Sequence, residues 1–123
     1  MARILVVEDE PSIAGIIQYK LRREGHLVQH EATHARVAAA AAEFAPQLVV
    51  LDASLEGEGR SLIQPLLRWG PVLVLTEIAD REGVESARLA GATATMEKPF
   101  KPTVLARRVH ELLRSASRPA ATP

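Results

Sequence analysis

The sequence predicts an α/β domain built around a parallel β-sheet. Short apolar runs of strand length alternate with segments in which apolar residues recur at helical spacing. Alternation of this kind favours right-handed crossovers between parallel strands. The length of 123 residues suits one domain, and 47% hydrophobic but only 3% aromatic residues indicate a core of Val, Leu, Ile and Ala.

The first two predicted strands flank one helix. Residues 4–7 form an apolar run, after which Pro11 suits the first turn of a helix. Apolar residues then recur at helical spacing over residues 11–24, and Gly25 can end the helix. Residues 27–30 are a short candidate for an edge strand.

An Ala-rich helix connects this edge strand to a central strand. Thr33 is a suitable N-cap for the helix, which runs to Phe44 and stops before Pro46. The next run, residues 48–51, contains no alternating polar residues. That pattern is expected of a strand that is buried on both faces.

The second half of the chain continues the alternation. Gly57 and Gly59 interrupt the chain after the central strand, and the apolar residues within 62–67 define one face of a third helix despite Pro65. The remaining predicted elements are a strand over residues 72–75, a helix over 81–90, a strand over 93–96 and a helix over 102–114.

Charge and composition exclude several classes of protein. The chain has 15 basic residues (Lys plus Arg) and 15 acidic ones (Asp plus Glu). It therefore lacks the overall positive charge that is typical of a domain that binds nucleic acid. The chain has no Cys and therefore no disulfide or thiolate chemistry. We expect a cytoplasmic protein with no membrane segment. Residues 1–114 form the predicted domain, and residues 115–123 a flexible tail or the start of a linker.

Residues suited to phosphate or to its metal ion stand at the ends of four predicted strands. Glu8 and Asp9 follow the first strand, and Asp52 follows the central one. Thr76 and Lys98 follow the last two. The carboxyl ends of parallel strands share one edge of a sheet, where ligands bind in open α/β folds. These side chains are therefore predicted to meet in a pocket suited to Mg²⁺ and a phosphoryl group.

Five short motifs follow one another at specific separations. They are ILVVEDE at residues 4–10, LVVLD at 48–52, VLT at 74–76, AGA at 90–92 and KPF at 98–100. Through these motifs the chain resembles the receiver domain of bacterial two-component response regulators. The resemblance implies a flavodoxin-like, five-stranded parallel sheet of order 2-1-3-4-5, flanked by five helices, with residues 1–114 as the receiver domain.

The resemblance also implies a role for each residue of the predicted pocket. A sensor histidine kinase or phosphotransfer protein would phosphorylate Asp52, with Mg²⁺ as cofactor. Lys98 would pair with Asp52 and then with a phosphoryl oxygen, while the Thr76 hydroxyl would hydrogen-bond to the phosphoryl group. The Lys98–Pro99 peptide bond would be cis. The implied metal ligands are Asp9, Asp52, Glu8 through water, and the backbone carbonyl of Ser54.

Several positions depart from the family's pattern. Glu77 follows Thr76 where a small residue is usual, and we expect its side chain to point outward because an inward carboxylate would repel a phosphoryl group. We also expect Glu77 to slow the exchange of phosphoryl donors and water at Asp52. Thr95 replaces the usual aromatic residue, and Glu56 replaces a usual Pro. Acidic residues of the family's charged dimer face are missing, so we expect a monomer or a weak dimer.

The leading hypothesis is a phosphoacceptor switch, not an enzyme, with slow autodephosphorylation at most. The runner-up is an atypical receiver that acts by protein contact without phosphorylation, motivated by Glu77 and Thr95. A phosphohydrolase of the haloacid dehalogenase type is disfavoured because Ser54 stands where such enzymes carry a second Asp. A flavodoxin is disfavoured because no hydroxyl-rich loop follows the first strand. A C-terminal output domain outside this chain is compatible with either receiver hypothesis.

Overall fold

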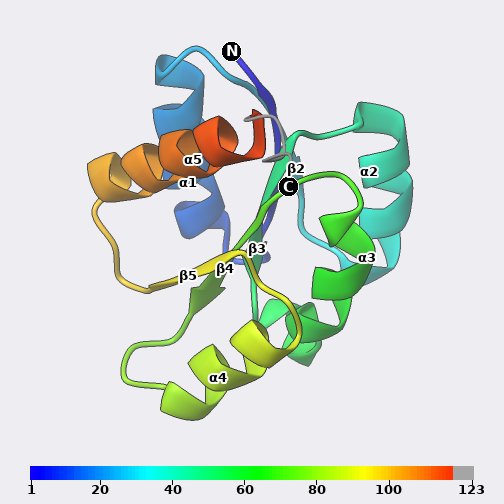
Figure 1. The fold of residues 1–123 in the computed structure, drawn as a ribbon, viewed down its shortest axis with the longest axis vertical. Helices are drawn as coiled ribbons and strands as arrows, with labels where there is room; N and C mark the ends of the chain where they lie inside the picture. Colours follow the sequence, from blue (N-terminus) through cyan, green and yellow to red (C-terminus); the bar gives the residue numbers. More distant parts are fainter. Residues whose placement is uncertain (118–123) are drawn as a thin grey trace, which may run out of the picture.

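Five parallel strands form one sheet in the computed structural model, which describes residues 1–117. The strands are β1 (Arg3–Val7), β2 (Leu27–Glu31), β3 (Leu48–Asp52), β4 (Val72–Thr76) and β5 (Ala94–Glu97). Their order across the sheet is β2-β1-β3-β4-β5 (Figure 1). The predicted flavodoxin-like sheet is thus confirmed.

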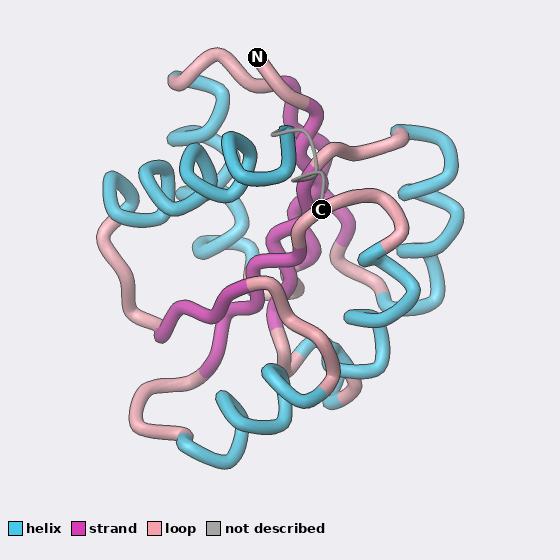
Figure 2. Tube along the Cα trace, viewed as in Figure 1, coloured by secondary structure: helices cyan, strands magenta, loops and turns pink. Residues whose placement is uncertain are grey.

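Helices cover both faces of the sheet (Figures 1 and 2). The helices α1 (Pro11–Arg23) and α5 (Pro102–Ser117) pack on one face. The helices α2 (Val37–Phe44), α3 (Ile63–Leu67) and α4 (Arg81–Leu89) pack on the other. The result is three layers, with the sheet buried between two layers of helices.

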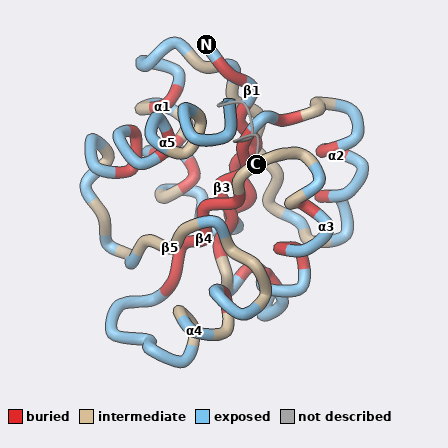
Figure 3. Tube along the Cα trace, viewed as in Figure 1, coloured by how far each residue is buried: buried red, intermediate tan, exposed pale blue. Residues whose placement is uncertain are grey.

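Alternate residues of the central strands face the two helical layers. Leu5 and Val7 of β1 pack with α2 and α3, whereas Ile4 and Val6 pack with α1 and α5. All residues of β3 and β4 are buried, while the edge strands β2 and β5 are more exposed (Figure 3). The absence of polar alternation in β3 therefore reflects apolar packing on both sides.

The helix after β2 begins differently from the prediction. A 3₁₀ turn (His34–Arg36) precedes α2, and the Thr33 side chain makes no capping hydrogen bond. The Glu56 side chain, far along the chain, accepts the His34 N–H at 2.7 Å instead. A tertiary contact at His34 thus takes the place of the predicted Thr33 cap.

Two other helix boundaries differ from the prediction. A 3₁₀ turn (Gly59–Leu62) leads into α3. Pro65 lies in the first turn of α3, where backbone N–H groups make no hydrogen bond within the helix, so the lack of an N–H in proline costs little there. α5 continues to Ser117, so residues 115–117 are helical and do not belong to a flexible tail. Residues 118–123, the rest of the predicted tail, lie outside the described residues.

A separate finding concerns hydropathy. None of the helices within residues 1–117 has the length and apolar character needed to cross a membrane.

Removing a buried leucine from the α5 layer should destabilise the domain strongly. Leu105 is fully buried, whereas Leu89 on α4 is 72% exposed. We expect Leu105→Ala to lower the free energy of unfolding by about 2–5 kcal/mol and Leu89→Ala by no more than about 0.5 kcal/mol. Urea unfolding followed by circular dichroism measures both, and similar midpoints for the two variants would contradict the described packing.

Candidate functional site

The predicted site residues meet at one edge of the sheet. Glu8 and Asp9 follow β1, while Asp52 and Thr76 are the last residues of β3 and β4. Lys98 follows β5, and its N–H donates to the Thr76 carbonyl oxygen at 2.8 Å. The parallel register of neighbouring strands brings these five positions together.

Three carboxylates form the acidic part of the site. Oxygen atoms of Glu8, Asp9 and Asp52 all lie within 4.8 Å of one another. Glu8 and Asp52 are buried, Asp9 is exposed, and Glu8 Oε1 has no hydrogen-bond partner among the described residues. Converging carboxylate oxygens with an unsatisfied buried acceptor are the donor set that a hard divalent cation such as Mg²⁺ prefers.

Ser54 holds the Asp52 carboxylate in place. Its backbone N–H and its hydroxyl donate to Asp52 Oδ1 at 3.1 and 2.9 Å. The Ser54 carbonyl, implied by the resemblance as a metal ligand, accepts the Gly57 N–H at 2.8 Å. A carbonyl oxygen has a second lone pair, so this turn leaves an acceptor site for a cation.

Lys98 supplies the positive charge of the site. Its Nζ lies 3.2 Å from Asp52 Oδ1 and 3.6 Å from Glu8 Oε1. Burial alone would lower the pKa of Lys98, but attraction by the Asp52 and Glu8 carboxylates raises the pKa above its ordinary value. The ammonium group is therefore charged at neutral pH.

The two buried carboxyl groups titrate differently. Burial and the adjacent Asp52 carboxylate raise the pKa of Glu8 from 4.5 to about 8. Burial alone would also raise the pKa of Asp52, but its contacts with Glu8 and Ser54 lower it. Without a cation, Glu8 therefore carries a proton at neutral pH and Asp52 is ionised.

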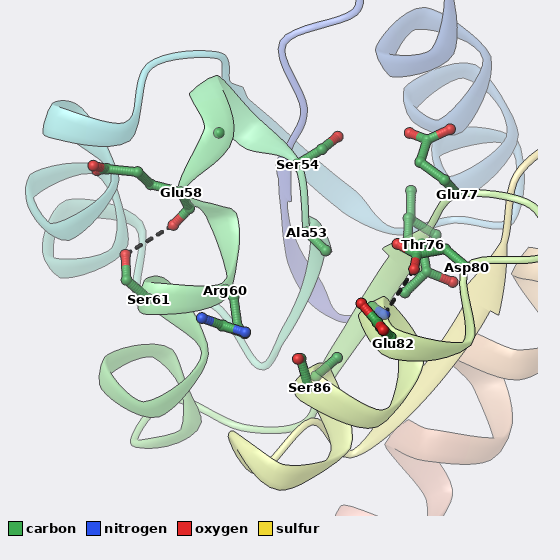
Figure 4. A pocket seen from close by; sticks show the side chains of 14 residues that line it. Ala53, Ser54, Glu58, Arg60, Ser61, Thr76, Glu77, Asp80, Glu82 and Ser86 are labelled. Carbon is green, nitrogen blue, oxygen red and sulfur yellow. Dashed lines mark hydrogen bonds between the residues drawn. The ribbon is translucent and has the colours of Figure 1, made fainter.

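The Thr76 side chain is buried beside open space. Its hydroxyl has no hydrogen-bond partner among the described residues. A cavity of about 730 Å³ lies beside it, between residues 53–61 and the first turns of α4 (Figure 4). The hydroxyl therefore has an unused donor, and the residue borders the cavity.

Glu77 lies at the exposed side of the site. Its side chain is 59% exposed, in line with an outward orientation, yet Glu77 Oε1 lies 3.4 Å from Lys98 Nζ. The contact was not expected, and it forms because the ammonium group attracts the carboxylate. Thr95 lies on β5, opposite Val74, and is partly buried.

The described geometry agrees with known proteins. A family model described as response regulator receiver domain matches residues 4–110. The chain belongs to this family. Response regulators are signalling proteins of two-component systems, and residues 4–110 match their receiver domain.

Two relatives show how much of a longer protein this receiver domain covers. Protein PetR of Rhodobacter capsulatus is 38% identical over 117 residues, which cover 90% of this chain and 48% of PetR. The DNA-binding response regulator MtrA of Mycolicibacterium smegmatis is 36% identical over 115 residues, covering 91% of this chain and 50% of MtrA. The chain thus spans about half the length of the curated relatives it matches.

Solved receiver domains share the fold over nearly their whole length. The receiver domain of NtrX from Brucella abortus has a TM-score of 0.84 at 31% identity, covering 91% of this chain and 98% of its own. The BeF₃-activated receiver domain of RstA from Klebsiella pneumoniae has a TM-score of 0.84 at 30% identity, with the same coverage. Both are similar to this chain in sequence as well as in fold.

Glu56 was singled out in the sequence only as a departure from the family's pattern, and its contacts beside the site were missed. Its backbone N–H donates to Asp9 Oδ2 at 3.1 Å, and its side chain accepts the His34 N–H. Its φ of 47° lies in the left-handed region, which is uncommon for a residue with a side chain. The sequence signals were its replacement of a usual Pro and its place between Asp52 and Gly57.

Two further residues support the site. His30 Nε2 lies 2.7 Å from the Glu8 carbonyl oxygen, so this nitrogen carries a hydrogen and donates it. The backbone of Gly59 passes against the end of β3, where a Cβ atom would clash with the Asp52 carbonyl oxygen. The sequence showed no ligand motif around His30, and Gly59 was predicted only to interrupt the chain.

Loss of the Glu56 side chain should loosen the loop after β3. Glu56→Ala leaves the His34 N–H without its acceptor, so we expect the free energy of unfolding to fall by about 1 kcal/mol. Glu43→Ala, which removes an exposed carboxylate from α2, is the control and should have little effect. Equal thermal unfolding curves for both variants would show that the contact does not stabilise the loop.

The metal-free domain should lose stability as the pH rises. The pKa of Glu8 is higher when folded, so its contribution is fully present below pH 4.5 and is lost as the pH rises through about 8. We expect a loss on the order of 1 kcal/mol per pH unit between roughly pH 5 and pH 8.

Urea unfolding in the presence of a chelator measures this slope. Glu8→Gln cannot titrate at this position and should have a much flatter dependence on pH. The same slope in the variant would assign the effect to other groups.

Proposed function

We propose that this receiver domain is a phosphoacceptor switch, in which Asp52 receives a phosphoryl group from a partner histidine kinase or phosphotransfer protein. The contact between Lys98 Nζ and Asp52 Oδ1, at the centre of the acidic cluster, is the observation that carries the proposal. It keeps an ionised carboxylate buried next to a cation that can also pair with phosphate.

The residues of the site suit transfer to a carboxylate. An Asp52 oxygen attacks the phosphorus atom, and the bond between phosphorus and the donor's nitrogen breaks as an acyl phosphate forms. Lys98 pairs with a phosphoryl oxygen, and the unpartnered Thr76 hydroxyl donates to another. Asp9, Asp52, the Ser54 carbonyl and, through water, Glu8 would hold Mg²⁺, which supplies positive charge for the transfer.

The output of the switch is a change of surface. Reorientation of Thr76 toward a phosphoryl group would alter the packing of α4, whose first turns line the adjacent cavity. Thr95 gives this chain no aromatic residue to accompany that movement. We propose a cytoplasmic domain that is a monomer or a weak dimer and that does not itself bind nucleic acid. An output domain outside this chain would carry the response.

The groove beside the acidic cluster suits a protein donor. A cavity of about 580 Å³ opens at Asp52 and Lys98, with an apolar wall that includes Ile13, Ile16 and Phe100. A small donor would use only the polar end of this cavity. Transfer from a protein can also bury apolar surface along the wall.

A second candidate function is a receiver that acts by contact alone. The Glu77 carboxylate already occupies one side of Lys98, which would disfavour a further anion. In that case the domain would present one fixed surface to a partner, without phosphorylation.

Phosphorylation can be tested directly by intact mass spectrometry. Incubation with Mg²⁺ and acetyl phosphate is expected to add one phosphoryl group to the native chain and none to Asp52→Asn, because the amide is not a nucleophile of comparable strength. Uptake by both proteins would place the acceptor elsewhere. No uptake by folded native protein would favour the contact-only function.

A further inference from the structure

Lys98 faces three carboxylates that differ in their freedom to move. Among the described residues, its Nζ lies within 4.0 Å of oxygen atoms of Asp52, Glu8 and Glu77. The side chains of Glu8 and Asp52 are 0% and 2% exposed, whereas that of Glu77 is 59% exposed. Only Glu77 can leave the ammonium group for water without crossing the protein interior.

The two buried partners are also held by other contacts. Ser54 donates two hydrogen bonds to Asp52, and the Asp9 N–H donates to Glu8 Oε2 at 3.1 Å. An ammonium group has three N–H donors, and three carboxylates surround this one. Within residues 1–117, only Asp52 is hydrogen-bonded to this ammonium group, and Glu77 is the one exposed carboxylate beside it, so an anion that approaches Lys98 from solvent meets the charge of Glu77.

The backbone keeps Glu77 beside Lys98 while leaving its side chain free. The Asp80 N–H donates to the Glu77 carbonyl oxygen at 3.3 Å, in a turn where Ala79 has a φ of 59°. The Lys98 N–H is bonded to the carbonyl oxygen of Thr76, the residue before Glu77. In Figure 4 the Glu77 carboxylate points away from the cavity-lining side chains of Arg60 and Ser86.

We propose that Glu77 is an internal competitor for Lys98, which a phosphoryl group must displace before it can bind. This inference rests on the proposed phosphoacceptor function and identifies the residue that sets the site's affinity for the phosphoryl group. The Glu77 side chain turns out to solvent as the anion arrives, because its exposed ion pair is weak compared with the contact to a dianion.

The same carboxylate should act on cation and anion binding with opposite signs. Glu77 adds negative charge near the cluster of Glu8, Asp9 and Asp52, which favours a divalent cation. It repels a phosphoryl group and occupies its ammonium partner. Removing the charge should therefore weaken Mg²⁺ binding while strengthening anion binding at saturating Mg²⁺, a pattern that general destabilisation of the fold would not produce.

The test uses BeF₃⁻, an anion that mimics a phosphoryl group without a transfer step. Its affinity is titrated at saturating Mg²⁺ by thermal stabilisation, and Mg²⁺ affinity is measured separately. The variants are Glu77→Gln, which keeps the size and removes the charge, and Glu82→Gln, which removes a charge from the first turn of α4. We expect Glu77→Gln to bind BeF₃⁻ about threefold to tenfold more tightly and to be phosphorylated faster by acetyl phosphate.

Three results would overturn the inference. Equal BeF₃⁻ affinity of Glu77→Gln and the native chain would overturn it, and uptake of phosphate by the native chain would show that the proposed function still stands. An equal gain in Glu82→Gln would assign the effect to overall charge and not to the contact with Lys98. Absence of both BeF₃⁻ binding and phosphate uptake in all folded variants would overturn the inference and the proposed function together.

Discussion

The acidic pocket depends on one ammonium group. Burying the carboxyl groups of Glu8 and Asp52 together would be costly without a positive charge close to them. Lys98 reaches both, and the proton held by Glu8 reduces the charge that remains. The parallel register of β1, β3, β4 and β5 makes the arrangement possible, since it brings four strand ends to one edge.

The strands and the principal site residues were predictable because one pattern specifies both. Each apolar run is buried by helices, and the polar residue that follows it lies at the open edge of the sheet. The direction of the Glu77 side chain was not predictable in this way. It follows from the contact with the Lys98 ammonium group, which no local pattern around residue 77 indicates.

Contacts between distant segments explain the other differences. The start of α2 depends on Glu56, which is 22 residues from His34, and Asp9 is bonded to the backbone of the same residue, 47 positions away. Neither hydrophobic periodicity nor a local sequence motif can predict contacts between residues so far apart in the chain. These contacts join the segment after β2 to the loop after β3, so the acidic end of the site is held together by residues outside the cluster of carboxylates.

Gly59 affects how the pocket would respond to sequence variation. Its backbone passes so close to the carbonyl of Asp52 that any side chain at this position must displace the end of β3 or the loop itself. In a survey of all single substitutions, position 59 would therefore rank beside Asp52 in sensitivity, although glycine brings no reactive atom. Substitutions at position 59 would be harmful because there is no space for a side chain. A map of mutational sensitivity, taken alone, would therefore overestimate the number of reactive residues in this pocket.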